Sequence, residues 1–128
     1  MTPLTITIDG PPVPKQRPRH VRRYDNVIIF TPKKTVKFEK AVKMQAVKAL
    51  HEWDDENFGD WDTSARFEVS MFFFFPDRRN RDLDNCVKSI TDALNKVVYD
   101  DDRQIDEIHA VRDVDRHNPR TVVVVRVL

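Results

Sequence analysis

The chain has 128 residues, one cysteine and a formal net charge of +1, so its size allows one hydrophobic core and we predict a single domain over residues 1–128. One cysteine excludes an intramolecular disulfide and is typical of a reducing compartment. The longest apolar run, residues 71–75, is too short to span a bilayer, and the amino terminus lacks the pattern of an export signal. We therefore expect a cytoplasmic protein without a membrane partner.

The charges are unevenly distributed along the chain. Residues 11–50 contain eleven Lys or Arg and two acids, whereas residues 51–62 contain six acids and no Lys or Arg. This separation predicts one surface for polyanions and another for cations or solvent.

The first elements are a strand and a basic segment. Apolar residues alternate with threonines over residues 4–8, which predicts a half-buried strand that ends in a turn. Four prolines then keep the backbone extended, and the basic side chains between them suit the phosphates of a nucleic acid. These side chains are Lys15, Arg17, Arg19, Arg22 and Arg23. A solvated basic loop is the alternative. Residues 24–30 are expected to complete a hairpin that turns around Asp25 and Asn26.

A long helix is predicted next, with Thr31 as its N-cap and Pro32 at its first position. Its apolar stripe consists of Phe38, Val42, Ala46, Ala49, Leu50 and Trp53. Lys33 and Lys37 lie off this stripe, where they either contact DNA or face solvent. Residues 54–63 are expected to form a loop. Aromatic residues this close to a helix end more often cover the core than stack on bases, so we expect them to cover the core here.

Three strands complete the predicted sheet. Residues 67–75 suggest a central strand covered on both faces, and Pro76 ends it. This strand would present three candidate phosphate-binding arginines, Arg78, Arg79 and Arg81. Residues 105–114 and 121–128 are predicted as strands that pair antiparallel with each other. The order predicts an α/β (α+β) fold, a two-layer domain with a mixed sheet covered by two main helices.

The segment 81–105 contains the candidate catalytic residues. Apolar residues at helical spacing from Leu83 to Val97 predict an amphipathic helix. Acidic clusters flank it, with Asp82 and Asp84 before it and residues 100–102 after it. Mg²⁺ binds a few carboxylates and leaves other positions to water and substrate phosphate, so these acids near Lys88 suggest phosphodiester chemistry. Helix capping is the alternative role for Asp82.

The two acidic clusters pose a geometric problem. A helix of about four turns would separate them by roughly 20 Å. One metal site within a single chain would require a shorter helix or a return of the acidic segment, and a dimer that shares its acids would also solve the problem.

The pattern resembles the signature of the RusA family. The matching residues are Pro76, Asp77, Arg78, Arg79, Asp82, Leu83, Asp84, Asn85, Lys88, Asp92, Ala93, Leu94, Asp101, Asp102 and Gln104. The amino-terminal segment 11–19 is similar to one branch of the family. The triplet 100–102 is more acidic than the usual pair, which leaves the ligand register there open by one residue. Asn80 interrupts what is often a longer arginine run.

The resemblance implies a bacterial or phage crossover junction endodeoxyribonuclease, which resolves four-way (Holliday) junctions by paired symmetric nicks in DNA recombination and repair. It implies a homodimer with Mg²⁺ as cofactor and Mn²⁺ as a substitute. It also implies catalytic roles for Asp82, Asp84, Lys88 and Asp102, and the three acids together with Asp101 are the candidate metal ligands. A non-catalytic DNA-binding recombination accessory protein and a small-molecule phosphohydrolase are the alternatives.

Overall fold

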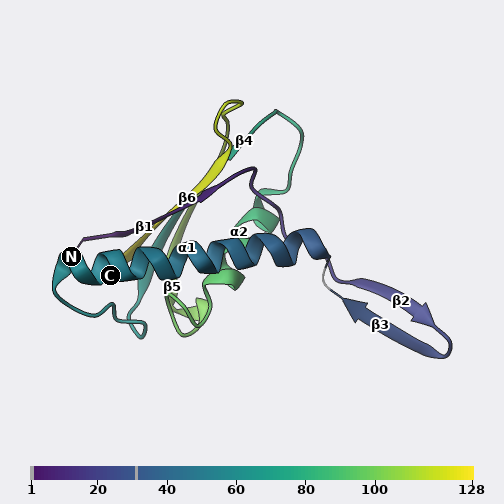
Figure 1. Cartoon of the computed structure of the whole chain (residues 1–128), viewed down its shortest axis with the longest axis horizontal. Helices are drawn as coiled ribbons and strands as arrows, with labels where there is room; N and C mark the ends of the chain where they lie inside the picture. The colour runs from purple at the N-terminus through teal and green to yellow at the C-terminus, as the bar shows by residue number, and fades with distance from the viewer. Residues whose placement is uncertain (1, 31) are drawn as a thin grey trace.

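The computed structural model describes residues 2–30 and 32–128, with only the backbone of Arg19 and Phe30. Its elements are β1 (Leu4–Asp9), β2 (Arg19–Arg23), β3 (Asn26–Phe30), α1 (Lys33–Asn57), β4 (Phe67–Phe75), α2 (Leu83–Leu94), η1 (Asp102–Gln104), β5 (Ile105–Val114) and β6 (Arg120–Val127). Four strands form the main sheet in the order β1-β6-β4-β5 (Figure 1). Only the β4–β5 pair is parallel, so the predicted α+β fold with a mixed sheet is confirmed.

The core lies on one face of the sheet. Alternate residues of β1 and β4 are buried, and they form one cluster with Phe38 and Val42 of α1 and Ile90 and Leu94 of α2. Both helices therefore cover the same face, which confirms the two-layer prediction. The other face of β4 carries only half-buried side chains, among them Phe72 and Phe74, so the expectation of a strand covered on both faces is wrong. Although β4 has apolar residues on both faces, helices cover only one of them.

The last strand lies elsewhere than the sequence suggested. β6 pairs antiparallel with β1 and with β4, and β4 separates it from β5, so the predicted pairing of the last two strands is wrong. The physical reason is the parallel pairing of β4 with β5, for which α2 supplies the necessary crossover. The valine-rich β6 thereby occupies a central position and β5 becomes an edge strand.

The boundaries of α1 also differ from the prediction. Thr31 lies outside the described residues, and Pro32 occupies the N-cap position with an extended ψ of 141° rather than the first helical position. At the other end α1 continues to Asn57, and Phe58 ends it in the left-handed conformation with φ 53°. Trp53 and Trp61 are buried with their rings at right angles, as expected for aromatic residues that cover the core. Phe58, the third aromatic residue of this segment, is 97% exposed, so the same expectation is wrong for Phe58.

The predicted hairpin is present as a separate two-stranded sheet formed by β2 and β3. It projects from the body beyond the start of α1 (Figure 1). Arg23 pairs with Asn26, so the two turn residues are Tyr24 and Asp25, one position earlier than predicted. Among the described residues, no helix is long and apolar enough to cross a membrane.

Candidate active site and nucleic-acid surface

The first acidic cluster starts α2. Asp82 is the N-cap, and its carboxylate accepts hydrogen bonds from the backbone N–H of Asp84 at 3.0 Å and from Nδ2 of Asn85 at 3.2 Å. The capping role considered for Asp82 is therefore observed. Asp84 follows in the first turn with its carboxylate exposed, where the partial positive charge of the helix terminus favours a negative group.

The chain reverses direction directly after α2. The helix ends at Leu94, a turn with Lys96 at φ 68° follows, and the backbone N–H of Lys96 donates to the carbonyl of Tyr99 at 2.8 Å. The buried Tyr99 hydroxyl donates to the carbonyl of Thr91 at 2.8 Å and fixes the returning segment against the helix. The helix is thus shorter than predicted, and the acidic segment returns along it. Both features reduce the separation of the two acidic clusters within one chain.

The reversal brings acids from both clusters to one cavity. Asp84, Lys88 and Asp102 line a surface cavity of about 340 Å³ together with Val87, Thr91, Ile105 and Ile108. Asp84 and Lys88 lie one helical turn apart and are both exposed, whereas Asp102 is half-buried at the start of η1. The cavity thus combines oxygen ligands for a hard cation with a cationic group that can face a phosphate.

Asp101 holds the returning turn in place. Its carboxylate accepts a hydrogen bond from the backbone N–H of Arg103 at 2.9 Å, which lowers the pKa of Asp101, and Gln104 completes a capping box. The amide nitrogen of Gln104 also donates to the carbonyls of Thr63 at 2.7 Å and Ala65 at 2.8 Å. Of the three consecutive acids, the structure places Asp102 in the cavity, Asp101 in a cap and Asp100 at the exposed surface.

Lys15 is part of the protein body. Its ammonium lies 2.9 Å from Glu39 of α1 and 2.8 Å from Asp92 of α2. Burial opposes its protonation, but the hydrogen bonds to Asp92 and Glu39 outweigh this effect and raise the pKa of Lys15. Asp92 therefore pairs with Lys15 rather than with Lys88, and within the described residues Lys88 forms no ion pair.

The start of the proline-rich segment is also fixed. Pro12 and Val13 are buried, the carbonyl of Val13 accepts from the Ser89 hydroxyl at 2.9 Å, and the N–H of Lys15 donates to the carbonyl of Asn85 at 2.8 Å. Val13 and Lys15 of the predicted nucleic-acid-binding segment are thus held against α2. The projecting part begins near the exposed Arg17.

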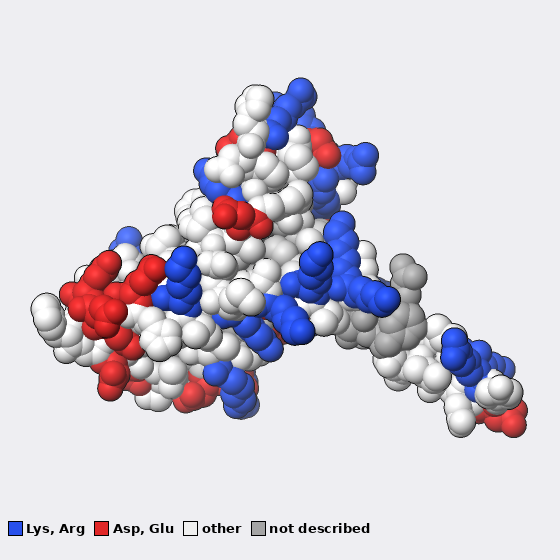
Figure 2. All heavy atoms as spheres, viewed as in Figure 1, with Lys and Arg blue, Asp and Glu red and all other residues white. Residues whose placement is uncertain are grey.

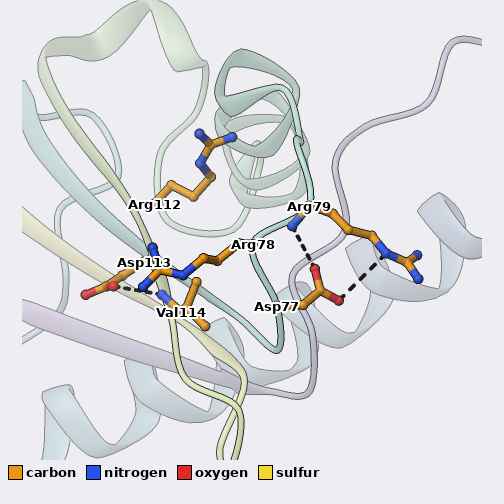
Figure 3. A pocket seen from close by; sticks show the side chains of 6 residues that line it. All are labelled: Asp77, Arg78, Arg79, Arg112, Asp113 and Val114. Atoms are coloured by element: carbon orange, nitrogen blue, oxygen red, sulfur yellow. Dashed lines mark hydrogen bonds and ion pairs between the residues drawn. The ribbon is translucent and has the colours of Figure 1, made fainter.

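A cavity rich in arginine lies where β4 and β5 end (Figure 3). It measures about 230 Å³, and its lining is Asp77, Arg78, Arg79, Arg112, Asp113 and Val114. The carboxyl ends of parallel strands are a common place for ligand sites in open sheets. Arg112 was missed by the sequence analysis because only the parallel pairing of β4 with β5 brings it beside Arg78 and Arg79.

Arg81 differs from the two other predicted arginines of this segment. Its guanidinium donates to Asp77 at 2.6 Å and lies 4.4 Å from the centre of the Phe75 ring. The side chain is only 19% exposed, so Arg81 fixes the approach to α2 and has little surface left for a phosphate.

In Figure 2 the largest cluster of acids lies at the left end of the molecule, whereas Lys and Arg predominate in the middle of the view and along the projecting hairpin. Arg17, Arg22, Arg23, Lys33 and Lys37 all have exposed side chains. Lys33 and Lys34 lie in the first turn of α1, and Asp55 and Glu56 lie in its last turn, so both ends carry the charge that the helix dipole disfavours. Local helix energetics therefore do not explain this charge pattern.

A second group of potential metal ligands was not anticipated. Ligand atoms of Glu68, Glu107 and His109 lie within 4.8 Å of one another, and this is the only such group of three or more His, Cys, Asp or Glu among the described residues. These side chains occupy the uncovered face of β4 and β5, where Glu68 lies opposite Glu107. This group could not be identified from the sequence, because the strand pairing alone assembles it.

Cys86 is fully buried in α2, and burial raises the pKa of its thiol to about 11. The thiol therefore stays protonated at neutral pH, as expected for a core residue rather than a nucleophile.

Comparison with known proteins shows the family of the chain. The chain is 27% identical over 129 residues to the crossover junction endodeoxyribonuclease RusA of Aquifex aeolicus (strain VF5), in an alignment that covers 98% of this chain and 93% of that protein. It is 38% identical over 53 residues to the crossover junction endodeoxyribonuclease rusA of Enterobacteria phage HK97, with 41% of this chain and 44% of that protein aligned. The family profile described as Endodeoxyribonuclease RusA matches residues 9–126, and the chain therefore belongs to the RusA family of endodeoxyribonucleases.

Proposed function

We propose that this protein is a Mg²⁺-dependent endodeoxyribonuclease that resolves four-way DNA junctions by paired symmetric nicks in recombination and repair. The observation that supports this most directly is the meeting of Asp84, Lys88 and Asp102 at one cavity on a chain of the RusA family. The relatives named above are crossover junction endodeoxyribonucleases, which gives the substrate class.

The residues of the cavity fit a magnesium ion. Asp84 and Asp102 offer hard carboxylate oxygens, both side chains reach solvent, and Mg²⁺ needs only one or two protein carboxylates beside water and phosphate. When bound, the ion would activate water and stabilise charge on the leaving oxygen. Mn²⁺ would be accepted by the same oxygen ligands.

The other residues have separate tasks in this proposal. Lys88 neutralises negative charge that develops on the scissile phosphate. Asp82 fixes the first turn of α2 through its bond to the N–H of Asp84, and Asp101 fixes the turn that carries Asp102. Asp82 and Asp101 also remain candidate metal ligands, since each carboxylate oxygen can accept more than one interaction.

DNA binding is assigned to the exposed basic residues. Arg17, Arg22 and Arg23, with Lys33 and Lys37 of α1, would contact the phosphate backbone. Arg78 and Arg79 would hold a phosphate near the start of α2, together with Arg112. Arg19 extends the basic series in sequence, while Lys15 and Arg81 shape the surface rather than contact DNA.

We further propose that two copies pair through the uncovered face of the main sheet. Phe72, Val111, Val122 and Val124 share this face, and Val111 is 46% exposed. Stacked sheets bury such side chains about 10 Å apart, and a twofold dimer suits the twofold symmetry of a junction. Because each chain assembles Asp84 and Asp102 by itself, each protomer would then cut one strand. We place this reaction in the cytoplasm, where bacterial and phage DNA recombines and where the buried Cys86 stays reduced.

Incubation with a synthetic four-way junction, the matching linear duplex and a nucleotide, each with and without Mg²⁺, tests the proposal. We expect Mg²⁺-dependent paired nicks in the junction alone. Junction binding without cleavage in any divalent metal would support the accessory-protein alternative, and turnover of the nucleotide would support the phosphohydrolase alternative.

A further inference from the structure

The hairpin of β2 and β3 has no core of its own and is separate from the main sheet. It nevertheless exposes large apolar side chains, with Val27 57%, Ile28 46% and Ile29 63% exposed. A two-stranded hairpin is at best marginally stable in water, and exposed aliphatic residues make it still less favourable. Such a hairpin indicates a surface that becomes covered when a partner binds.

The charges of the hairpin indicate what the partner is. His20, Arg22 and Arg23 lie on β2, and Asp25 is the only acid between residues 17 and 37. Arg22 pairs with Val27 and His20 with Ile29, so the basic side chains of β2 lie beside the aliphatic side chains of β3 on the same face. A basic ribbon with apolar side chains suits a nucleic acid, whose backbone is anionic and whose bases are flat and apolar.

The tip carries an aromatic residue in an unfavourable conformation. Tyr24 has a φ of 55° and is 97% exposed, so its ring packs against none of the residues that the structure describes. The left-handed conformation is unfavourable for a residue with a bulky side chain, and glycine or asparagine is the usual residue in such a turn. Strain of this kind is often retained where a side chain meets a ligand.

The dimensions fit as well. Each strand has five residues, so the hairpin extends by about 17 Å at ~3.3 Å per residue. That length exceeds the depth of the major groove, about 8.5 Å, so a residue at the tip can reach the bases while the start of the hairpin stays level with the phosphates. The exposed Arg17 and Lys33 flank its base, where they can contact the phosphates on either side.

From these observations we propose that the β2–β3 hairpin enters the branch point of the four-way junction and that Tyr24 stacks on a base there. This inference rests on the proposed junction substrate. In this proposal the hairpin recognises the unstacked bases at the branch point. Phosphate contacts alone do not provide such recognition.

Junctions with 2-aminopurine either at the branch point or inside one arm provide the test, with binding measured in EDTA so that cleavage does not interfere. Tyr24→Ala is compared with Tyr24→Phe, which keeps the ring. Phe58→Ala is the matched control, because Phe58 is also 97% exposed with a φ of 53° but lies at the acidic end of α1. Unchanged thermal melting confirms that each variant is folded.

We expect the wild type, Tyr24→Phe and Phe58→Ala to change the fluorescence of the branch-point probe only. Tyr24→Ala should lose this signal and bind the junction roughly tenfold more weakly, because base–aromatic stacking contributes about 1–3 kcal/mol. Its salt dependence should not change, since no phosphate contact is removed.

A Tyr24→Ala variant with wild-type affinity and signal would overturn the inference, as would equal signals from the two probe positions. A change from dimer to monomer on sedimentation of Tyr24→Ala would also overturn it and assign the hairpin to a second copy of the chain. Cleavage in Mg²⁺ is scored separately, so a protein that stacks Tyr24 on the branch point without cutting would contradict the proposed activity and leave the inference supported.

Discussion

Asp84 at the start of α2 and Asp102 in η1 line the same cavity, although the whole of α2 separates them in the sequence. The relationship depends on the turn after Leu94 and on the bonds that Asp101 and Gln104 make around η1. One chain therefore assembles both acids without help from a partner.

The first prediction concerns the support of this turn. Gln104→Leu removes the hydrogen bonds to Thr63, Ala65 and the N–H of Asp101, and it should lower the free energy of unfolding by about 1–3 kcal/mol. Cleavage should fall as well, because Asp102 loses its fixed position. Chemical denaturation and a junction-cutting assay measure the two effects. Arg103→Gln is the control, because this neighbouring side chain is 88% exposed. A Gln104→Leu protein as stable as that control would disprove the role of Gln104 in supporting the turn.

The second prediction separates Lys15 from Arg17. Lys15→Gln leaves Glu39 and Asp92 without their shared cation and should destabilise the fold by on the order of 1 kcal/mol. The salt dependence of junction binding should stay unchanged. Arg17→Gln should do the reverse, with an unaltered melting temperature and a salt slope lower by about one. Thermal melts and salt titrations of both variants decide this, and equal slopes for the two variants would contradict it.

The third prediction separates two neighbouring arginines. Arg78→Gln should lower the salt slope of DNA binding by about one and leave stability unchanged, because Arg78 is exposed beside the cavity of Figure 3. Arg81→Gln should instead lower the melting temperature, since Asp77 and Phe75 both lose a partner. If Arg81→Gln melts like the wild type and reduces the slope, Arg81 binds phosphate after all.

Most of the elements could be predicted from local sequence patterns. The period-two pattern of β1, the spacing of apolar residues in both helices and the hairpin all depend on neighbouring residues, which is why these predictions are confirmed. The position of β6 could not be predicted in this way, because strand order depends on which long-range pairs form rather than on the pattern within a strand.

The same distinction holds for the candidate site. Asp84, Lys88 and Asp102 were identified from their chemistry and from a family signature, but the cavity they share depends on how the chain reverses after Leu94. Arg112 and the group of Glu68, Glu107 and His109 were missed because strand pairing brings together residues that are far apart in the sequence. The ion pairs of Lys15 could not be predicted, because its two acidic partners belong to helices whose packing the sequence does not specify.

The fourth prediction concerns the uncovered sheet face. Val111→Lys places a charge in the proposed dimer interface and should shift the protein toward the monomer, because a buried unpaired charge is costly. Met44→Lys makes the same kind of change on α1, where Met44 is 69% exposed, and should leave the oligomeric state unchanged. Sedimentation velocity over a range of concentrations distinguishes the variants. If Val111→Lys and Met44→Lys form dimers of equal affinity, the interface lies elsewhere.

The fifth prediction tests the central claim, that Asp84 and Asp102 together hold the catalytic cation. Mn²⁺ binding, followed by the loss of its free-ion electron paramagnetic resonance signal, is measured beside junction cleavage for Asp84→Asn, Asp102→Asn, Asp100→Asn and His109→Ala. An amide keeps the shape of a carboxylate but loses the charge that holds the ion, so the first two variants should lose both metal binding and cleavage while junction binding persists. Asp100→Asn and His109→Ala should retain both activities, since neither Asp100 nor His109 lines the cavity of Asp84 and Asp102. Loss of Mn²⁺ binding and cleavage in His109→Ala, with both retained in Asp84→Asn and Asp102→Asn, would contradict the account and assign the metal to Glu68, Glu107 and His109.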